Sequence, residues 1–378
     1  KLLCRDIAIR HTHPKSGLSY ISDWCRRANL QRVLEVAFQD VHALDKFTQL
    51  ANSSTKVYRA FPRGLAIHWM AGNVPTLGFL SLLQGLLTKN ANIIKIASNQ
   101  DDLLAQLLGI LSQTGQGKGK SGKDLVQSIA VVRYERSKAQ LGSVLSQNAD
   151  VRLFWGSDES IQALQSLPSK LHTQDIVFSN KSSFIVIDEE ALTSKGFDAL
   201  AKRAALDISV FEQKACASPH TIFLETMSSA VVEKFSCALK YSLHSLLDSL
   251  PKSTPTPQES SAILNLRTQY EMFNQCWNSE GLEFSILHDS SFKLGPSIGN
   301  RVIFVRTVQD ASSIASLITP QIQSIGLAVK DNRFFHLSNL YASKGCVRIV
   351  KVGSMTHFES PWDGYMLLHH LVRWVSCQ

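Results

Sequence analysis

The chain has 378 residues, of which 44% are hydrophobic and 19% are charged. These values exclude a disordered chain and are typical of a globular protein with two or more domains. The net charge of +8 comes from the first part of the chain, because residues 1–150 hold 19 Lys and Arg against 10 Asp and Glu. A basic region can bind nucleic acid, an anionic surface or a polyphosphate cofactor. Without a zinc-ligand spacing or an aromatic RNA-binding motif, we favour the cofactor and expect no nucleic-acid partner.

The seven cysteines are scattered without C-x-x-C spacing. An odd number at irregular intervals argues against a disulfide framework or a structural zinc site and fits a reducing compartment. No secretory signal pattern opens the chain. We therefore expect a soluble cytoplasmic protein without a metal site. Because the chain begins at Lys1 rather than Met, we also expect that its natural N-terminus is missing.

Apolar spacing in the first half of the chain predicts helices that alternate with short, fully apolar strands, as in a parallel sheet with α/β architecture. Residues 65–88 carry no charged side chain and are long enough to cross a bilayer, but "GNVP" interrupts any continuous helix, so we expect no membrane span. The predicted helices lie within 20–50, 76–88, 101–112 and 137–147, from 156 onward, and over 196–209; the predicted strands are 65–70, 92–98, 128–134, 151–155 and 182–188.

The second half continues the alternation after a boundary predicted near residue 209. Strands are expected at "HTIFLE", "LEFSIL", "NRVIFVR" and "GLAVK", with a helix near 310–317. Residues 248–261 are rich in Pro, Ser and Thr and predict a surface loop or linker. The resulting division is a first domain over 1–208 and a second over 209–349, with the segment from about 350 to 378 packing back on the first.

Three short motifs are candidate ligand sites. "TGQGKGKSGKD" (114–124) has the spacing G-x-x-x-x-G-K, but Asp124 replaces the Ser or Thr of a phosphate loop, and a helix rather than a strand precedes it, so we interpret it as a flexible basic loop. In "LFWGSDES", Gly156 and Ser157 follow a strand and begin a helix, an arrangement that either binds an anion or only caps the helix. In "AGNVP", Asn73 either points its amide at a ligand or bonds its own turn.

The order of Asn73, Lys95, Gly156-Ser157 and then Cys216 in "FEQKACASPH" resembles the aldehyde dehydrogenase superfamily. Three segments are more closely similar to its LuxC-type acyl-CoA (fatty acid) reductases: residues 64–98, residues 207–225 and residues 345–375. The resemblance implies an aldehyde dehydrogenase-like α/β fold, with a Rossmann-type cofactor domain and a second α/β domain that carries the nucleophilic cysteine.

The resemblance also implies a role for each matching residue. Cys216 takes the acyl group from a thioester, and Asn73 together with the backbone N–H of Cys216 forms the oxyanion hole. Gly156 and Ser157 hold the cofactor pyrophosphate, and Lys95 reaches the adenosine ribose. Trp155 and Ser98 are further residues of the implied cofactor site. The implied reaction is reduction of a long-chain acyl thioester (acyl-CoA or an acyl carrier) to the aldehyde, with an acyl-protein synthetase as partner and a homo-oligomeric assembly.

Two departures from the superfamily pattern sharpen this hypothesis. Ser98 stands where many NAD-using members carry a carboxylate, so Lys95 can attract a 2′-phosphate and we expect NADPH. Val177 stands where aldehyde-oxidising members carry the glutamate that activates water, which favours reduction over hydrolysis, although Glu212 near Cys216 is a possible substitute.

Two other functions remain open from the sequence. Cys216 and His220 are four residues apart, as in a cysteine acyl hydrolase, but Pro219 and a following strand oppose a helical pairing. A reductase-like domain without catalysis is the other alternative, although a scaffold needs neither Cys216 nor Asn73. His68, His369 and His370 are interpreted as core or surface residues.

Overall fold

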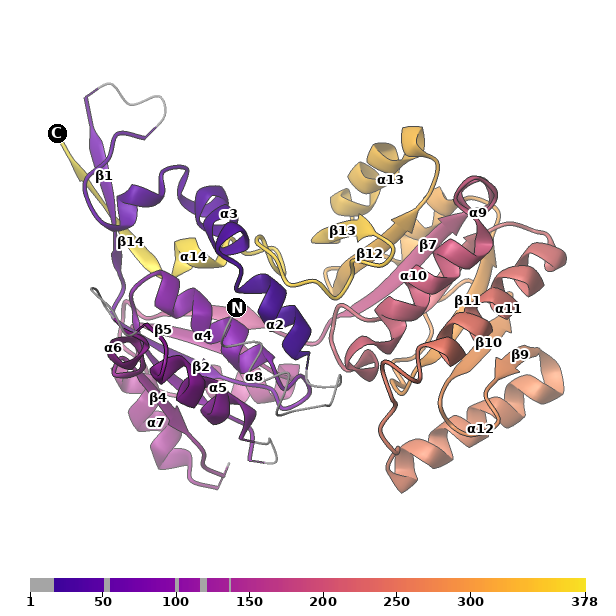
Figure 1. Ribbon diagram of the computed structural model, residues 1–378, viewed down its shortest axis with the longest axis horizontal. Helices are drawn as coiled ribbons and strands as arrows, with labels where there is room; N and C mark the ends of the chain where they lie inside the picture. The colour runs from indigo at the N-terminus through magenta and orange to yellow at the C-terminus, as the bar shows by residue number, and fades with distance from the viewer. Residues whose placement is uncertain (1–16, 51–54, 99–101, 116–120, 136) are drawn as a thin grey trace. The chain divides into compact units, whose positions relative to one another are not determined.

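The computed structural model describes residues 17–50, 55–98, 102–115, 121–135 and 137–378. They form two compact units, which are described separately (Figure 1). Unit 1 contains the residues up to Asn180 together with Phe358–Gln378, and unit 2 is Lys181–His357.

Unit 1 is built on a five-stranded parallel sheet in the order β4-β3-β2-β5-β6. The interior strand β5 is buried along its whole length because helices cover both faces of the sheet. The strands are β2 (Leu65–Trp69), β3 (Ala91–Lys95), β4 (Ile129–Val132), β5 (Val151–Trp155) and β6 (Gln174–Phe178).

Helices connect successive parallel strands of unit 1, so the sheet is built from βαβ units. One face of the sheet packs through Ile67, Trp69 and Phe154 against Ala149 and Ile161, which lie at α7 and α8. The helices are α4 (Leu77–Leu87), α5 (Leu103–Ser112), α6 (Gly122–Val126), α7 (Ala139–Asn148) and α8 (Asp158–Gln165).

An early strand and the last strand of the chain pair within unit 1. Strand β1 (Val57–Pro62) pairs antiparallel with the C-terminal strand β14 (Val372–Cys377), as Figure 1 shows. A second apolar core joins residues before β1 to the C-terminal segment, with Phe38, Leu80 and Leu368 buried together. The elements here are α2 (Leu18–Trp24), α3 (Arg27–Phe38), η2 (Val41–Leu44) and α14 (Leu367–His370).

Unit 2 is built on a seven-stranded sheet in the order β13-β12-β7-β8-β11-β10-β9, parallel except for the edge strand β9. The side chains of the central strands are buried on both faces, so two apolar clusters form, one on each side. The strands are β7 (Ser182–Asp188), β8 (Pro219–Glu225), β9 (Gln275–Asn278), β10 (Ser285–Asp289), β11 (Val302–Val308), β12 (Ile322–Ala328) and β13 (Arg348–Lys351).

Helices cover both faces of this sheet. Helices α10 and α11 pack together over one face, and η4 with α13 covers the other. The elements are α9 (Glu189–Lys195), α10 (Phe197–Ser209), η3 (Val210–Gln213), α11 (Ser229–Ser245), α12 (Pro257–Phe273), η4 (Ala311–Leu317) and α13 (Asp331–Ser343).

The division of the chain differs from the predicted one. Unit 1 ends at Asn180 rather than near residue 208, because β7 pairs with β8 and β12 and thus belongs to the second sheet. The C-terminal part of the chain does return to unit 1, but only from Phe358, since β13 pairs with β12 in unit 2.

Several predicted elements are also corrected. The predicted loop over 248–261 ends at Thr256, which caps α12 through a capping box with Glu259. The helical pattern within 20–50 is divided among α2, α3 and η2, and the helix near 310–317 is a 3₁₀ helix. No helix among the described residues is long and apolar enough to cross a membrane; residues 65–88 form β2, a turn and α4, as predicted.

The glycine-rich stretch is described only in part. Residues 116–120 lie outside the described residues. Beyond them, Ser121 caps α6, and the Asp124 carboxylate accepts a hydrogen bond from the Ser121 backbone N–H at 2.7 Å. Asp124 thus serves a capping box rather than a phosphate loop.

Candidate functional site

The carboxyl edge of the unit 1 sheet gathers all predicted cofactor residues and Asn73. Asn73 lies in the exposed turn between β2 and α4, and Gly156 follows β5. Strands β2 and β5 are neighbours at which the chain changes direction across the sheet, since β3 and β4 lie on one side and β6 on the other. Open parallel sheets bind ligands in the crevice beyond the carboxyl ends of strands at such a switch point.

Gly156 and Ser157 form the entry to α8. The Gly156 N–H donates to the Phe178 carbonyl at 3.2 Å, and the Ser157 hydroxyl accepts from the Ser160 N–H at 3.4 Å. A Cβ added to Gly156 would lie 3.7 Å from the Ser160 Cβ, an ordinary contact. The packing of the chain itself therefore does not require glycine here. The absence of a side chain instead leaves space over the strand end that a ligand can occupy.

Lys95 and Ser98 lie at the carboxyl end of the neighbouring strand β3. Lys95 is the last residue of β3, and its Nζ is 5.2 Å from the centroid of the Tyr134 ring. Ser98 follows in an exposed turn. A cationic group and a neutral hydroxyl thus lie on the same strand end, three residues apart.

Trp155, at the same edge, is held by ring contacts and by a hydrogen bond. Its indole is buried and stacks on Phe178 with ring centroids 3.7 Å apart, and Phe178 makes an edge contact with Tyr365. The Trp155 Nε1–H donates to the Ser81 hydroxyl at 3.2 Å. Phe178, Tyr365 and Ser81 were not identified from the sequence, which carries no signal for stacking between distant segments.

The polar network beneath Trp155 contains a buried histidine. His68 on β2 contacts the Ser81 Oγ through Nδ1 at 2.7 Å and the Asn92 Oδ1 through Nε2 at 3.2 Å. Complete burial lowers the pKa of His68 to about 4, against the opposing hydrogen bond to Asn92. With Ser81 accepting from Trp155 and donating to His68, the imidazole is neutral and carries its proton on Nε2. His68 is thus a core residue, as the sequence analysis interprets it.

Cys216 lies in unit 2, in the turn between η3 and β8. The Ser218 N–H donates to the Ala215 carbonyl at 2.9 Å and closes the turn, and Cys216 is half-buried within it. The backbone before the turn is unusual, because Phe211, Glu212 and Gln213 all have positive φ angles of 55°, 54° and 60°. Consecutive left-handed residues other than glycine are uncommon and need support from the surrounding structure.

Contacts from neighbouring segments supply this support. The Gln213 side-chain amide donates to the Pro219 carbonyl at 2.8 Å and to the Val302 carbonyl at 3.0 Å. The Glu212 carboxylate accepts from the backbone N–H of Ser253 at 2.6 Å and from its hydroxyl. Glu212 is buried and held by these bonds, an arrangement suited to anchoring the turn.

The structure does not pair Cys216 with His220. The His220 Nε2 contacts the Ser297 hydroxyl at 2.9 Å, and its Nδ1 has no hydrogen-bond partner among the described residues. Burial lowers the pKa of His220 to about 4, so it is neutral in the sheet. This geometry removes the observation that favours a Cys–His hydrolase.

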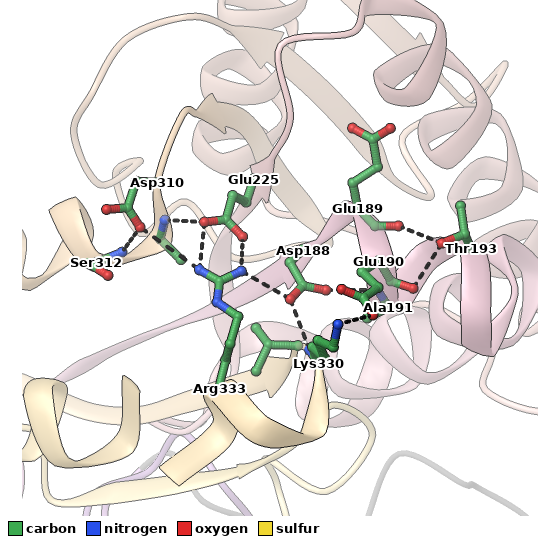
Figure 2. A network of polar contacts seen from close by, with 12 residues as sticks. Asp188, Glu189, Glu190, Ala191, Thr193, Glu225, Asp310, Ser312, Lys330 and Arg333 are labelled. Carbon is green, nitrogen blue, oxygen red and sulfur yellow. Dashed lines mark hydrogen bonds and ion pairs between the residues drawn. The ribbon is translucent and has the colours of Figure 1, made fainter. Parts of the chain in front are cut away.

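The opposite edge of the unit 2 sheet is closed by an ion-pair network (Figure 2). Arg333 donates to the Glu225 carboxylate at 2.7 Å and to Asp188 at 3.2 Å. The hydrogen bond to Glu225, and then the negative charges of Glu225, Asp188 and Asp310, raise the pKa of Arg333. Asp188 ends β7 and Glu225 ends β8, whereas Cys216 precedes β8. The nucleophile candidate therefore lies at the amino edge of this sheet, away from the network.

Val177 lies within β6 and packs against the apolar core of unit 1. Val177, the residue expected at the position of the water-activating glutamate, therefore makes an apolar contact and provides no acid–base group. Among the described residues, no cluster of His, Cys, Asp and Glu has the composition to hold a metal ion.

Comparison with known proteins identifies the family. A family model described as acyl-CoA reductase (LuxC) matches residues 2–374. The chain belongs to the LuxC family of acyl-CoA reductases. It is thus an oxidoreductase with the aldehyde dehydrogenase-like α/β fold that the sequence predicts.

LuxC-family relatives match most of the chain. A long-chain acyl-protein thioester reductase of Photorhabdus laumondii is 27% identical over 368 residues, covering 93% of this chain and 71% of the relative. One from Vibrio harveyi is 26% identical over 359 residues, with the same coverage.

Solved structures share the fold of this LuxC-family chain. A putative aldehyde dehydrogenase of Anabaena variabilis has a TM-score of 0.68 and 13% identity, with 99% of this chain and 83% of that one covered. An NADP-dependent glyceraldehyde-3-phosphate dehydrogenase of Bacillus halodurans, solved with NADP, has a TM-score of 0.65 and 15% identity, with coverages of 99% and 82%.

Proposed function

We propose that this protein reduces a long-chain fatty acyl thioester to the aldehyde with NADPH, through an acyl intermediate on Cys216. The family match over residues 2–374 carries the reaction class. The long-chain acyl group follows the relatives, which are named long-chain acyl-protein thioester reductases. The acyl donor is CoA or a carrier protein, and an acyl-protein synthetase and further copies of this chain are the proposed partners.

Cys216 is the proposed nucleophile. It lies half-buried in a supported turn just before strand β8, where a thiolate can meet a substrate while its backbone stays in place. Attack of the sulfur on the thioester carbonyl forms the acyl-cysteine bond and releases the thiol of the donor. Asn73 and the Cys216 N–H are the proposed donors to the oxyanion, and each such donor typically contributes about 2.7–4 kcal/mol to the transition state.

The carboxyl edge of the unit 1 sheet fits a nicotinamide dinucleotide. It combines a switch point in the strand order, the cation of Lys95, and Gly156, a glycine that the packing of the chain does not itself require. Gly156 and Ser157 would hold the pyrophosphate at the start of α8, Trp155 would support them from below, and Lys95 with Ser98 would meet the 2′-phosphate. When bound, the cofactor supplies a hydride to the acyl carbon. The resulting hemithioacetal on Cys216 then collapses to aldehyde and thiolate.

The environments of Val177 and Glu212, the two positions considered for a base, support reduction over hydrolysis. Hydrolysis of an acyl-cysteine needs a base that delivers water. Val177 packs in the core, and Glu212 accepts two hydrogen bonds from Ser253. Neither residue provides such a base in this arrangement, which favours an acyl-enzyme that survives until hydride transfer.

The test is turnover of purified protein with tetradecanoyl-CoA and NADPH, followed by NADPH consumption and by aldehyde formation. We expect one aldehyde for each NADPH oxidised. Cys216→Ala should abolish both signals, whereas Cys237→Ala, at an exposed position on α11, should leave them unchanged. Release of free fatty acid without NADPH consumption would contradict the proposal.

A further inference from the structure

The Cys216 turn has a second hydrogen bond, which comes from a residue outside the known motifs. The turn spans residues 215–218, so Cys216 and Ala217 are its two central residues. The carbonyl of Cys216, in the peptide between them, accepts a hydrogen bond from the Ser183 hydroxyl at 2.7 Å. Ser183 is 2% exposed. A buried hydroxyl therefore fixes the central peptide of the turn that carries the nucleophile.

Strand irregularities explain why the Ser183 side chain can reach this carbonyl. The register between β7 and β8 shifts between Ser183 and Phe184, and Ser183 is paired with Pro219, which has no N–H to give to the ladder. The register between β7 and β12 also shifts, between Ile322 and Ile325. Such bulges occur beside active sites, where they redirect a side chain.

The second strand irregularity supplies a partner for Ser183. The backbone N–H of Ser324, within the shifted part of β12, donates to the Ser183 Oγ at 3.1 Å. The Ser183 hydroxyl thus accepts a hydrogen bond from β12 and donates one to Cys216, and removing its oxygen would remove both. Ser324 is fully buried, so its N–H cannot turn to water if the hydroxyl is lost.

The hydrogen bond opposes a specific rearrangement of the turn. The two common β-turn types differ by a flip of the central peptide, and the flipped form needs a positive φ at the third residue. Ala217 does not have a positive φ, and as alanine it disfavours one. Gln213, which precedes the turn, donates hydrogen bonds to β8 and β11. The Ser183 hydroxyl contacts the central peptide itself, through the Cys216 carbonyl.

We propose that Ser183 is a positioning residue for Cys216, which keeps the Cys216–Ala217 peptide in one orientation and so sets the direction of the thiol. This inference rests on the proposed function where it concerns acyl transfer. Ser183 does not exchange a proton with the substrate. It acts through the backbone of the nucleophile.

The main test measures the rate at which tetradecanoyl-CoA acylates Cys216 in the absence of cofactor. Mass spectrometry of the Cys216 peptide follows the reaction, and the rate is normalised to the amount of folded protein. Losing one buried hydrogen bond should slow acylation in Ser183→Ala by about tenfold, with the KM for the acyl donor unchanged. Ser183→Thr, which keeps the hydroxyl, should restore the rate, and Ser182→Ala at the adjacent position should not change it. A wild-type rate in Ser183→Ala would overturn the proposal.

A shape-matched pair covers the case in which Ser183→Ala folds poorly. Ser183→Val and Ser183→Thr differ only by a methyl for a hydroxyl, and both suit a strand. We expect Ser183→Val to acylate about tenfold more slowly than Ser183→Thr, again from the loss of one buried hydrogen bond. Equal rates for these two variants would overturn the positioning role.

Alkylation of Cys216 by iodoacetamide separates this inference from the proposed function. Without the Ser183 hydrogen bond the turn should expose the half-buried Cys216 thiol more often. Ser183→Ala should therefore be alkylated about threefold faster than wild type, which corresponds to the loss of a weak hydrogen bond. If no protein is acylated but alkylation differs in this way, the proposed function fails and the positioning role stands. If wild type is acylated and Ser183→Ala matches it in both assays, the positioning role fails alone.

Discussion

Ser98 is the side chain on which the proposed preference for NADPH over NADH depends. Its exposed hydroxyl follows β3, close in sequence to the cation of Lys95. A carboxylate here would accept the ribose hydroxyls of NADH and repel a 2′-phosphate. Ser98→Glu should therefore lower the ratio of kcat/KM for NADPH over NADH by at least about tenfold. Steady-state kinetics with both cofactors measure this, and Ser249→Glu, which adds the same charge in unit 2, should keep the wild-type ratio.

Gly156 tests whether the strand end of β5 meets the cofactor. An added Cβ would make only an ordinary contact at 3.7 Å, so Gly156→Ala should keep the melting temperature while it obstructs a ligand that lies against the backbone. We expect the cofactor Kd to rise by about tenfold, as for loss of one close contact. Fluorescence titration with NADPH gives the Kd.

Gly85 provides the matched contrast to Gly156. A Cβ on Gly85 would lie 1.9 Å from the Asn92 Oδ1, inside the network of His68. Gly85→Ala should lower the free energy of unfolding by about 1–3 kcal/mol through overpacking. If Gly156→Ala were equally unstable, a purely structural need for that glycine would follow.

Element η3 shows what can be learned only from the structure. Its three left-handed residues include no glycine and no asparagine, so the sequence gives no sign of the turn that precedes Cys216. The start of α12 is the opposite case. Thr256, Pro257 and Glu259 form a capping signature that the sequence displays, although the surrounding Pro, Ser and Thr residues favoured a linker.

Glu212 connects η3 to two neighbouring segments. Its carboxylate accepts from Ser253, and its carbonyl accepts from the Asn300 N–H at 3.1 Å. Burial lowers the pKa of Arg301, and the negative charge of Glu212 opposes this effect. Glu212→Gln should therefore lower the free energy of unfolding by about 1–3 kcal/mol, because buried groups lose their partner.

Urea unfolding measures this effect, with Glu233→Gln on the exposed face of α11 as the control. An unchanged stability together with a complete loss of reductase activity would instead indicate that Glu212 takes part in the chemistry.

Across the whole molecule, the sequence predicts elements better than it predicts their partners. The strands over 65–70, 92–98, 128–134 and 151–155 correspond to β2, β3, β4 and β5, because apolar runs between turn residues are local signals. The same run at 182–188 forms β7, but in the second sheet. A strand buried on both faces fits either parallel sheet, so its residues do not encode the partner. The site follows the same rule: Cys216 and Gly156 stand in recognisable motifs, whereas Ser183 and Ser81 act through distant contacts.

The two units should respond differently to acid. In unit 2, His220 has a pKa lowered to about 4 by burial, whereas burial raises the pKa of Asp207 to about 7. The stability that a buried neutral histidine contributes is lost as pH falls from 6.5 toward about 4. The stability linked to a carboxyl with a raised pKa is greater at low pH and is lost as pH rises toward about 7. The two effects oppose each other in unit 2.

Unit 1 contains His68, whose pKa is lowered to about 4, and carries five of the six tryptophans. Its stability should fall as pH decreases from 6.5 toward about 4, by about 3 kcal/mol in total, because the unfolded chain takes up a proton that the folded core excludes. Urea unfolding followed by tryptophan fluorescence at about pH 7 and about pH 5 measures this loss. In His68→Gln, the decrease between these pH values should become smaller by about 2 kcal/mol, because proton uptake by the unfolded chain begins near pH 6.5. An identical decrease in wild type and His68→Gln would show that His68 is not the group that makes this unit acid-sensitive.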